Sequence, residues 1–299
     1  MNRKSRFVFS FLLFLLFSLT SLSSSQQTQP PQNQQEPEPV KALQVKGNIY
    51  EVKGGRGANC GFFIGEKEVL VIDGKMTEES AQAMIDEIKK LTSNPIKYVV
   101  LTHSDGDHVN GLPGFPGNID IIAHSQTRED MAEVFKEPEK KLYLPNVTFA
   151  KKYIIRSGKA QIKLLHFGPA HTSGDAVVYF PAEKVAFLGD LLFLGRDPLI
   201  HRHKNGSSFG LVKTLKAILK LDADTFVHGH GDMAKKSDAE ALIKALQEKQ
   251  NRIRTLIKEG KTLEEIKEIF GVKDIPLPPG GTQRPGLVET IYLELTQKK

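Results

Sequence analysis

Short apolar runs that end beside a histidine or an aspartate are the feature that most restricts how this chain can fold. Residues 69–72 end at Asp73, and residues 98–101 lead directly into a segment rich in His and Asp. Short runs rich in Val and Ile favour buried strands. The same pattern predicts further strands at 119–123, 162–165, 177–180, 185–188 and 225–227. Because a rigid sheet fixes the loops at its strand ends, polar side chains there indicate a functional site.

Helical patterns alternate with these runs and indicate layers of helix against sheet. Thr77 suits the N-cap of a helix whose apolar face would consist of Ala81, Met84, Ile85, Ile88 and Leu91. Later helices are predicted at 209–221, 237–257, 262–270 and 287–295. No change of composition separates residue 40 from the C-terminus. We therefore expect one domain over 40–250, with a C-terminal helical extension over 251–299 packed on it.

The first 25 residues have the layout of a secretory signal peptide. Arg3, Lys4 and Arg6 precede an apolar stretch over 7–22, and three serines follow it. The stretch is shorter than the ~20 residues of a typical membrane span. We therefore expect removal and export, to the periplasm or outside the cell, with retention as a membrane anchor as the alternative. Residues 26–39, rich in Gln and Pro, are predicted to form a linker.

Charge and cysteine content exclude some classes of function. The net charge of +6 falls to about +3 without the three basic residues at the N-terminus. Nucleic-acid-binding proteins need a clustered basic face, so no nucleic-acid partner is expected. Cys60 is the only cysteine, which excludes an intramolecular disulfide and a cysteine-cluster metal site.

Four potential metal ligands lie within six residues in His103-x-Asp105-x-Asp107-His108, on a glycine-containing loop after a predicted strand. Imidazole nitrogens and carboxylate oxygens suit zinc, iron or manganese. The alternative is a capped turn with solvated aspartates. Three later segments argue against that alternative, because each contains a His or Asp of the same kind: His171 in GPAHTSGD, Asp190 in LGD and His230 in HGHG.

In this order and spacing the four segments resemble the metallo-β-lactamase superfamily, over about residues 48–232. The resemblance implies a mixed α/β fold, a four-layer αβ/βα sandwich with metals at one edge of its inner sheets. It also implies two divalent ions, with zinc as the expected metal. The ligands implied for the first metal are His103, Asp105 and His171, those for the second are Asp107, His108 and His230, and the bridging ligand is Asp190.

The resemblance further implies a mechanism. A hydroxide between the metals would be the nucleophile, because a metal can lower the pKa of bound water to about 7. The metals would also polarise the scissile group. Asp107 would be the catalytic residue that orients the nucleophile and helps to move protons. Asp73 would orient ligands without binding metal itself.

Asp105 departs from the commoner pattern of the family, His-x-His-x-Asp-His. Two divalent ions carry four positive charges, and Asp105, Asp107, Asp190 and a hydroxide would supply four negative ones. The centre would then be about neutral instead of about +1. A more oxygen-rich first site predicts a preference there for iron or manganese, or a partly filled zinc site.

The predicted function is that of an exported hydrolase acting on an ester, lactone or amide, similar to a β-lactamase or a lactonase. Its partner would be a small-molecule substrate, which His201 or His203 could contact, although polar residues of an exposed loop are an equal alternative. Only 40 positions separate Asp190 from His230, too few for the inserted domain of the nuclease branch.

Two other functions stay open. One is a metal-binding protein of this fold without turnover. The other is a di-iron redox protein like the flavodiiron oxygen reductases, which need a flavin domain that this chain has no residues to build. The sequence predicts no oligomeric state.

Overall fold

The computed structural model describes residues 36–272 and 284–297. The chain divides into Met1–Glu36 and Pro37–Lys299, and nearly all described residues belong to the second unit. The predicted signal peptide and residues 26–35 of the predicted linker lie outside the described residues. Among the helices of the described part, none is both long and apolar enough to cross a membrane.

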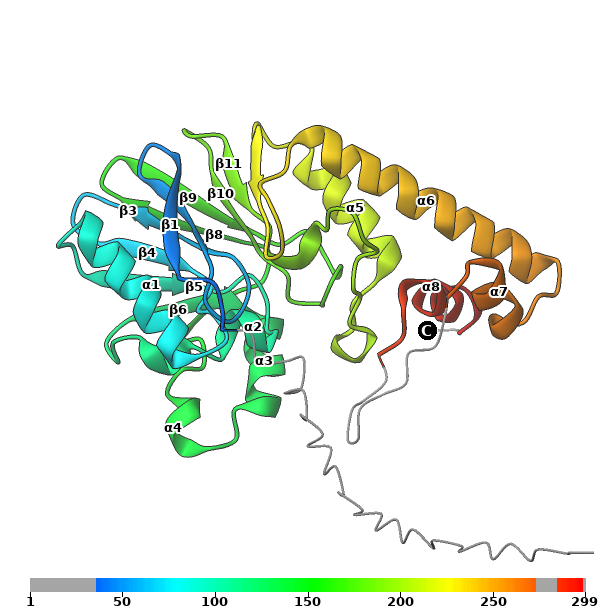
Figure 1. Ribbon diagram of the computed structural model, residues 1–299, viewed down its shortest axis with the longest axis horizontal. Helices are drawn as coiled ribbons and strands as arrows, with labels where there is room; N and C mark the ends of the chain where they lie inside the picture. Colours follow the sequence, from blue (N-terminus) through cyan, green and yellow to red (C-terminus); the bar gives the residue numbers. More distant parts are fainter. Residues whose placement is uncertain (1–35, 273–283, 298–299) are drawn as a thin grey trace, which may run out of the picture. The chain divides into compact units, whose positions relative to one another are not determined.

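The first sheet contains seven strands in sequence order (Figure 1). Its strands are β1 (Lys41–Lys46), β2 (Ile49–Lys53), β3 (Cys60–Ile64), β4 (Val69–Ile72), β5 (Ile96–Val100), β6 (Asp120–His124) and β7 (Val147–Phe149). Strands β1 to β4 pair antiparallel, and β4 to β7 pair parallel.

The second sheet contains five strands in the order β12-β11-β10-β9-β8. They are β8 (Lys152–Ser157), β9 (Ala160–Leu165), β10 (Val177–Phe180), β11 (Val185–Phe187) and β12 (Thr225–Val227). All neighbours pair antiparallel except β11 and β12, which pair parallel.

Helices cover the outer faces of both sheets (Figure 1). The α-helices are α1 (Glu78–Leu91), α2 (Gly106–Val109), α3 (Ser125–Val134), α4 (Pro138–Lys141), α5 (Ser208–Ile218), α6 (Lys236–Lys258), α7 (Leu263–Ile269) and α8 (Leu287–Thr296). Three short 3₁₀ turns are η1 (Leu112–Gly114), η2 (Gly189–Leu191) and η3 (Arg202–Lys204). The expected domain boundary at 250/251 falls inside α6.

Three apolar clusters divide the fold into four layers. Leu70 and Ile72 of β4 pack between the sheets, whereas Val69 and Val71 pack under α1. A third cluster joins the outer face of the second sheet to α5, α6 and α8. Because β4 is buried on both faces, its sequence is continuously apolar, as is typical of strands covered on both sides. The predicted α/β sandwich is confirmed.

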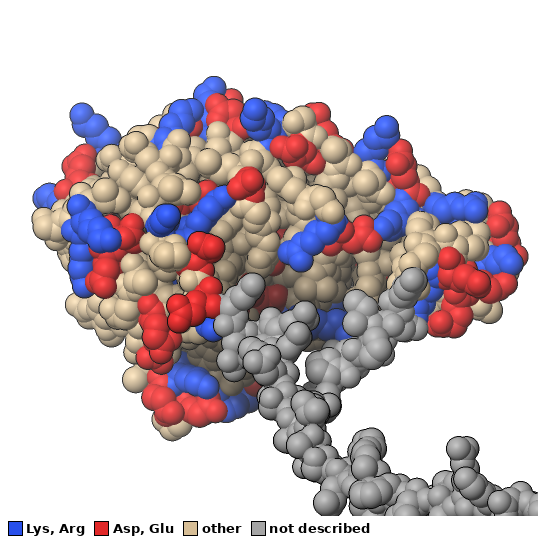
Figure 2. All heavy atoms as spheres, viewed as in Figure 1, with Lys and Arg blue, Asp and Glu red and all other residues tan. Residues whose placement is uncertain are grey.

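The predicted α1 is also present, and Thr77 accepts a hydrogen bond from the Ser80 amide as its N-cap. Leu91, however, is 47% exposed, because the helix ends there. Sequence analysis missed β1, β2, β3, β7 and β8. The edge strand β1 is mostly exposed and reads KALQVK, so it lacks the apolar run that marked the inner strands. Basic and acidic side chains are interspersed over the described face that Figure 2 draws.

Candidate metal centre

The main ligand loop is fixed by the parallel pairing of β4 with β5. Carboxyl ends of parallel strands meet at the same edge of a sheet, so Asp73 after β4 lies beside Thr102 after β5. The Thr102 amide donates to Asp73 Oδ1 and the Thr102 hydroxyl donates to Asp73 Oδ2, both at 2.8 Å. The backbone then turns into α2, which carries Asp107 and His108.

Asp73 also determines which ring nitrogen faces the centre in two histidines. His108 Nδ1 lies 2.8 Å from Asp73 Oδ2, and this carboxylate oxygen accepts the ring proton. The Thr102 hydroxyl has already given its proton to Asp73, so it must accept from His103 Nδ1 at 3.0 Å. Both rings therefore direct an unprotonated Nε2 into the centre while they are neutral, which is the form that binds metal.

His171 is held in the same way by a different part of the chain. Its Nδ1 donates to the Leu199 carbonyl at 2.8 Å, which leaves Nε2 for the centre. The buried Asp175 carboxylate fixes the turn that carries this histidine, because it accepts from the Thr172 amide and, at 2.7 Å, from the Thr172 hydroxyl. Burial raises the pKa of Asp175 to about 6. The sequence analysis gave Asp175 no role.

Strands β11 and β12 also pair parallel, so the loops that follow them place Asp190 and His230 at the same edge. The Gly229 amide donates to the Gly189 carbonyl at 2.9 Å, which ties the two loops together. A Cβ at Gly229 would lie 2.3 Å from Asp190 Oδ1, so only glycine fits this approach. Asn59, which the sequence did not single out, donates its side-chain amide to the carbonyls of the same loop.

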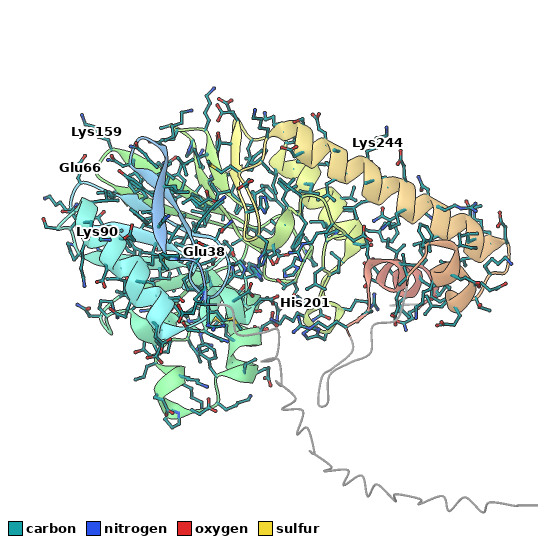
Figure 3. The ribbon with its side chains drawn as sticks, viewed as in Figure 1. Glu38, Glu66, Lys90, Lys159, His201 and Lys244 are labelled. Carbon is teal, nitrogen blue, oxygen red and sulfur yellow. The ribbon has the colours of Figure 1, made fainter. Side chains whose placement is uncertain are left out.

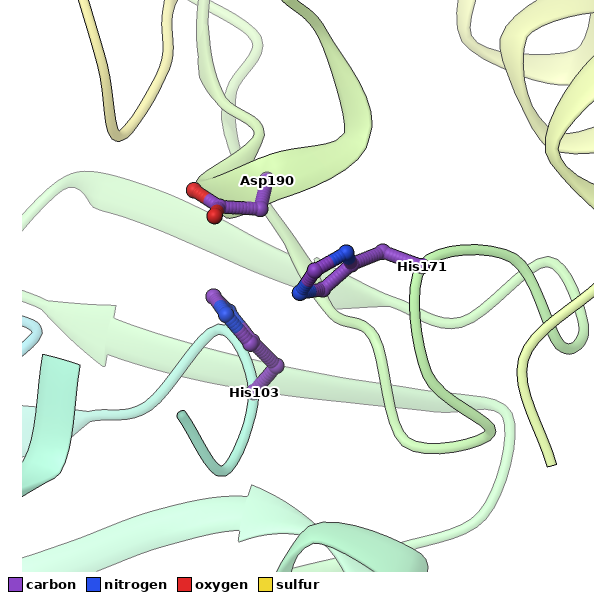
Figure 4. A group of neighbouring side chains, drawn as sticks. All are labelled: His103, His171 and Asp190. Atoms are coloured by element: carbon purple, nitrogen blue, oxygen red, sulfur yellow. The ribbon is translucent and has the colours of Figure 1, made fainter. Parts of the chain in front are cut away.

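The seven predicted ligands converge at this edge in overlapping groups. Figure 4 shows the side chains of His103, His171 and Asp190 directed toward one another from three separate segments. We call Asp107, His108 and His230 the Asp107 cluster. Asp105 and His171 form a group with His201, which we call the Asp105 cluster. Within each group the ligand atoms lie within 4.8 Å of one another.

The donor atoms at the centre fit divalent cations. His103 Nε2, His108 Nε2 and Asp190 Oδ1 are buried and have no hydrogen-bond partner among the described residues. A buried polar atom without a partner costs roughly 1–3 kcal/mol, so such atoms are rare unless an ion or a ligand satisfies them. Imidazole nitrogens together with carboxylate oxygens are the donors that zinc, iron and manganese accept. These residues therefore fit the metal centre that the sequence predicted.

The electrostatics of the centre also favour a cation. Burial lowers the pKa of His108, but the negative charges of Asp73 and Asp190 outweigh burial and raise this pKa well above its usual range. Hydrogen bonds to Asp107 and Asp190 raise the pKa of His230 to about 9. Carboxylates that hold protons on neighbouring imidazoles would stabilise a metal ion in the same position.

Asp105 has two partners that the sequence did not predict. Lys204 Nζ lies 2.7 Å from Asp105 Oδ1, and His201 Nε2 lies 2.6 Å from Asp105 Oδ2. Burial raises the pKa of Asp105, but hydrogen bonds from His171 and His201 outweigh burial and hold the pKa far below its usual range. Lys204 adds a positive charge that the charge sum based on the sequence omitted.

The two tentative substrate residues differ in their surroundings. His201 is 2% exposed and directs its ring to Asp105, whereas His203 is exposed in the next turn, with its ring centroid 5.0 Å from that of His201. Both line a cavity of about 300 Å³ at the mouth of the centre. Its other lining residues are Met76, Asp105, Gly106, Asp107, Lys204 and Arg284.

Comparisons with known proteins agree with this fold. The family model described as the metallo-beta-lactamase superfamily matches residues 54–230. A type 2 metallo-beta-lactamase from Elizabethkingia meningoseptica is 27% identical over 54% of this chain. The alpha subunit of a 2,4-dinitroanisole O-demethylase from Nocardioides sp. is 24% identical over 56%. The chain spans 66% and 50% of the length of these two relatives.

Solved structures show the same fold. A metallo-beta-lactamase from Pontibacter korlensis superposes with a TM-score of 0.60 at 19% identity, over 70% of this chain and 99% of that structure. At this identity the likeness establishes the architecture. The region matched by the family model, residues 54–230, contains the ligand loop, the turn of His171 and the ends of β11 and β12.

Proposed function

The chain belongs to the metallo-beta-lactamase superfamily, and on this basis we propose that it is an exported hydrolase that cleaves an ester, lactone or amide in a small molecule. One observation carries the proposal. Three histidines, each anchored through Nδ1, direct Nε2 toward buried carboxylates beside an open cavity. This arrangement suits hydrolysis better than a purely structural metal site, which would be closed to substrate.

Metal ions bound here would supply Lewis acidity toward the scissile carbonyl and would lower the pKa of a water molecule to about 7. The residues that would hold them are the seven predicted ligands. We propose that the centre binds two divalent ions and that zinc is the preferred metal. Lys204 supports zinc, because its charge offsets the extra carboxylate of Asp105, and this weakens the argument for iron or manganese in the first site.

Asp107 is the residue best placed to handle protons. Its side chain is 28% exposed and lines the cavity, and Oδ2 lies 3.2 Å from His230 Nε2. Burial raises the pKa of Asp107, but His230 and His108 outweigh burial and lower it. Asp107 is therefore ionised at neutral pH and can accept a hydrogen bond from an attacking water, which orients that water toward the substrate.

The cavity of about 300 Å³ suits a small molecule. Export is supported by the composition of the first 25 residues alone. N-terminal sequencing of protein from the native host tests it: a mature start near Gln26 is expected, and a start at Met1 would refute cleavage.

A panel of lactones, esters and β-lactams on protein of measured metal content tests the hydrolase. We expect turnover that disappears with a chelator and returns with zinc. His108→Ala should lower turnover more than about 100-fold, because it removes a ligand whose supporting contacts alone are worth about 10- to 100-fold in metal affinity.

The matched control for this variant is His124→Asn, since His124 lies outside the centre and caps α3, and Asn retains the capping function. Turnover that resists the chelator would contradict the mechanism. Full loading with metal and no turnover on any substrate would favour a binding protein.

A further inference from the structure

Three imidazole nitrogens surround a single oxygen of Asp105. His201 Nε2 lies 2.6 Å from Asp105 Oδ2, His171 Nε2 lies 3.2 Å from it, and His103 Nε2 lies 3.8 Å from it. The three side chains are nearly inaccessible to solvent. From the sequence, two of these histidines were expected at the first metal, and His201 was expected either to contact substrate or to lie in an exposed loop.

Proton counting shows that this group needs positive charge, either as an additional proton on an imidazole or as a metal ion. His171 uses its ring proton on the Leu199 carbonyl, and His103 uses its own on the Thr102 hydroxyl. When neutral, both rings therefore present lone pairs toward a carboxylate oxygen, which is unfavourable in a buried site. A metal ion among these atoms would turn this repulsion into coordination.

Backbone hydrogen bonds hold His201 in this position independently of the contacts of its side chain. The His201 amide donates to the His171 carbonyl at 2.8 Å, so the loop over residues 200–207 runs alongside the turn of His171. Figure 3 labels His201 on this loop. The Ser207 amide donates to the Ala170 carbonyl, also at 2.8 Å, at the other end of the loop. A Cβ at Gly206 would lie 2.3 Å from the His171 carbonyl oxygen, which shows how closely the two segments approach.

Lys204 determines which oxygen of Asp105 is available to bind a metal ion. Its ammonium group donates to Asp105 Oδ1 at 2.7 Å and to the Ser104 hydroxyl at 3.0 Å. Oδ1 is therefore occupied from outside the centre, and Oδ2 is the oxygen that His201 faces. Ligating carboxylates are commonly held in this way through their second oxygen.

We propose that His201 is a ligand of the first metal and binds it through Nε2, together with His103, His171 and Asp105 Oδ2. His201 thereby supplies a third imidazole to a site in which Asp105 replaces one. The inference rests on the metal centre of the proposed function but does not depend on its substrate. In the competing arrangement, His201 only donates a hydrogen bond to Asp105.

Nitrogen-15 labelling of the histidine rings, combined with loading by cadmium-113, distinguishes the two arrangements. Each metal-bound Nε2 gives a resonance that is split by coupling to cadmium. We expect five split resonances in the wild type, from His103, His108, His171, His201 and His230. His201→Gln should show four, and the matched control His203→Gln, in the same loop, should retain five.

Four split resonances in the wild type, unchanged in His201→Gln, would overturn the inference and leave the hydrolase intact. A wild-type protein that gives five split resonances but hydrolyses no substrate would contradict the proposed function alone. Absence of any split resonance would overturn both. Chelator competition supplies a second readout: His201→Gln should weaken binding of one cadmium ion by about 100-fold or more and leave the other within about threefold.

Thermal unfolding of both variants in excess chelator checks the fold without metal. The chelated His201→Gln protein should unfold within a few degrees of the chelated wild type, since Gln can still donate to Asp105.

Discussion

The two clusters of the centre are supported in different ways. The Asp107 cluster is built from strand ends: Asp73 follows β4 and fixes His108, while β12 leads into His230. The Asp105 cluster depends on the 200–207 loop, which has no strand of its own and supplies His201 and Lys204. One half of the centre is therefore fixed by sheet register and the other by loop packing.

The clusters also differ in their access to solvent. The side chain of His230 is 33% exposed, whereas His171 and His201 of the Asp105 cluster are at most 2% exposed. Solvent therefore reaches His230 more easily than either histidine of the Asp105 cluster. The two buried imidazoles of the Asp105 cluster are suited to hold a metal ion.

The C-terminal helices explain how a loop can be held firmly enough for this purpose. The Ser208 amide, at the start of α5, donates to the Glu294 carboxylate of α8 at 3.1 Å, and the Ser208 hydroxyl contacts the same group. Arg202 in the loop donates to the Gln297 side chain at 3.0 Å. The helical extension thus braces the loop that closes the Asp105 cluster.

Among residues that support the ligands without binding metal, the largest effect is expected from Asp73→Asn. Asn tolerates the positive φ of 62° at this position. Its side-chain NH2 group, however, would face His108 Nδ1 and could not accept the ring proton. Metal affinity of the Asp107 cluster should fall by about 10- to 100-fold, which chelator competition measures. Asp120→Asn, at an exposed hydrogen bond on β6, is the control and should bind as the wild type does. Equal losses of metal affinity in both variants would show that Asp73 has no specific role in supporting the centre.

A smaller effect is expected from Lys204→Met. This change removes the cation from Asp105 Oδ1 and leaves the charge of the carboxylate unbalanced. We expect about a 10-fold loss of affinity for one metal, with the other retained. Lys213→Met, at an exposed position on α5, is the matched control. If Lys204→Met weakens both metals equally, the two clusters are not independent.

The smallest effect on metal binding is expected from Gly206→Ala. The added Cβ would lie 2.3 Å from the His171 carbonyl oxygen, so the 200–207 loop must shift. Unfolding free energy should fall by about 1–3 kcal/mol, as denaturant titration would measure. Metal affinity should fall less than 10-fold. Gly117→Ala, where a Cβ meets nothing within 4 Å, is the control. Unchanged stability in Gly206→Ala would show that the loop is loosely held.

The residue patterns alone predicted layers of helix against sheet and a cluster of His and Asp at the strand ends, and the resemblance to the metallo-β-lactamase superfamily implied the four-layer fold and the seven ligands. Strands and motifs could be predicted because both signals are local. A buried strand needs a continuous apolar run, and each ligand lies within a few residues of a strand end or inside a short motif. The weaker strands were missed where they lie at an edge and lose that apolar signal, as β1 does.

The surroundings of Asp105, by contrast, depend on how distant parts of the chain pack together. Lys204 is 99 positions and His201 is 96 positions away in sequence, in a loop without regular spacing. Asn59 and Asp175 likewise act through contacts with turns, which no motif marks. Periodicity reports which face of an element is buried, but the path of a loop depends on the segments packed against it. The partners of Asp105 therefore became visible only once the chain was folded.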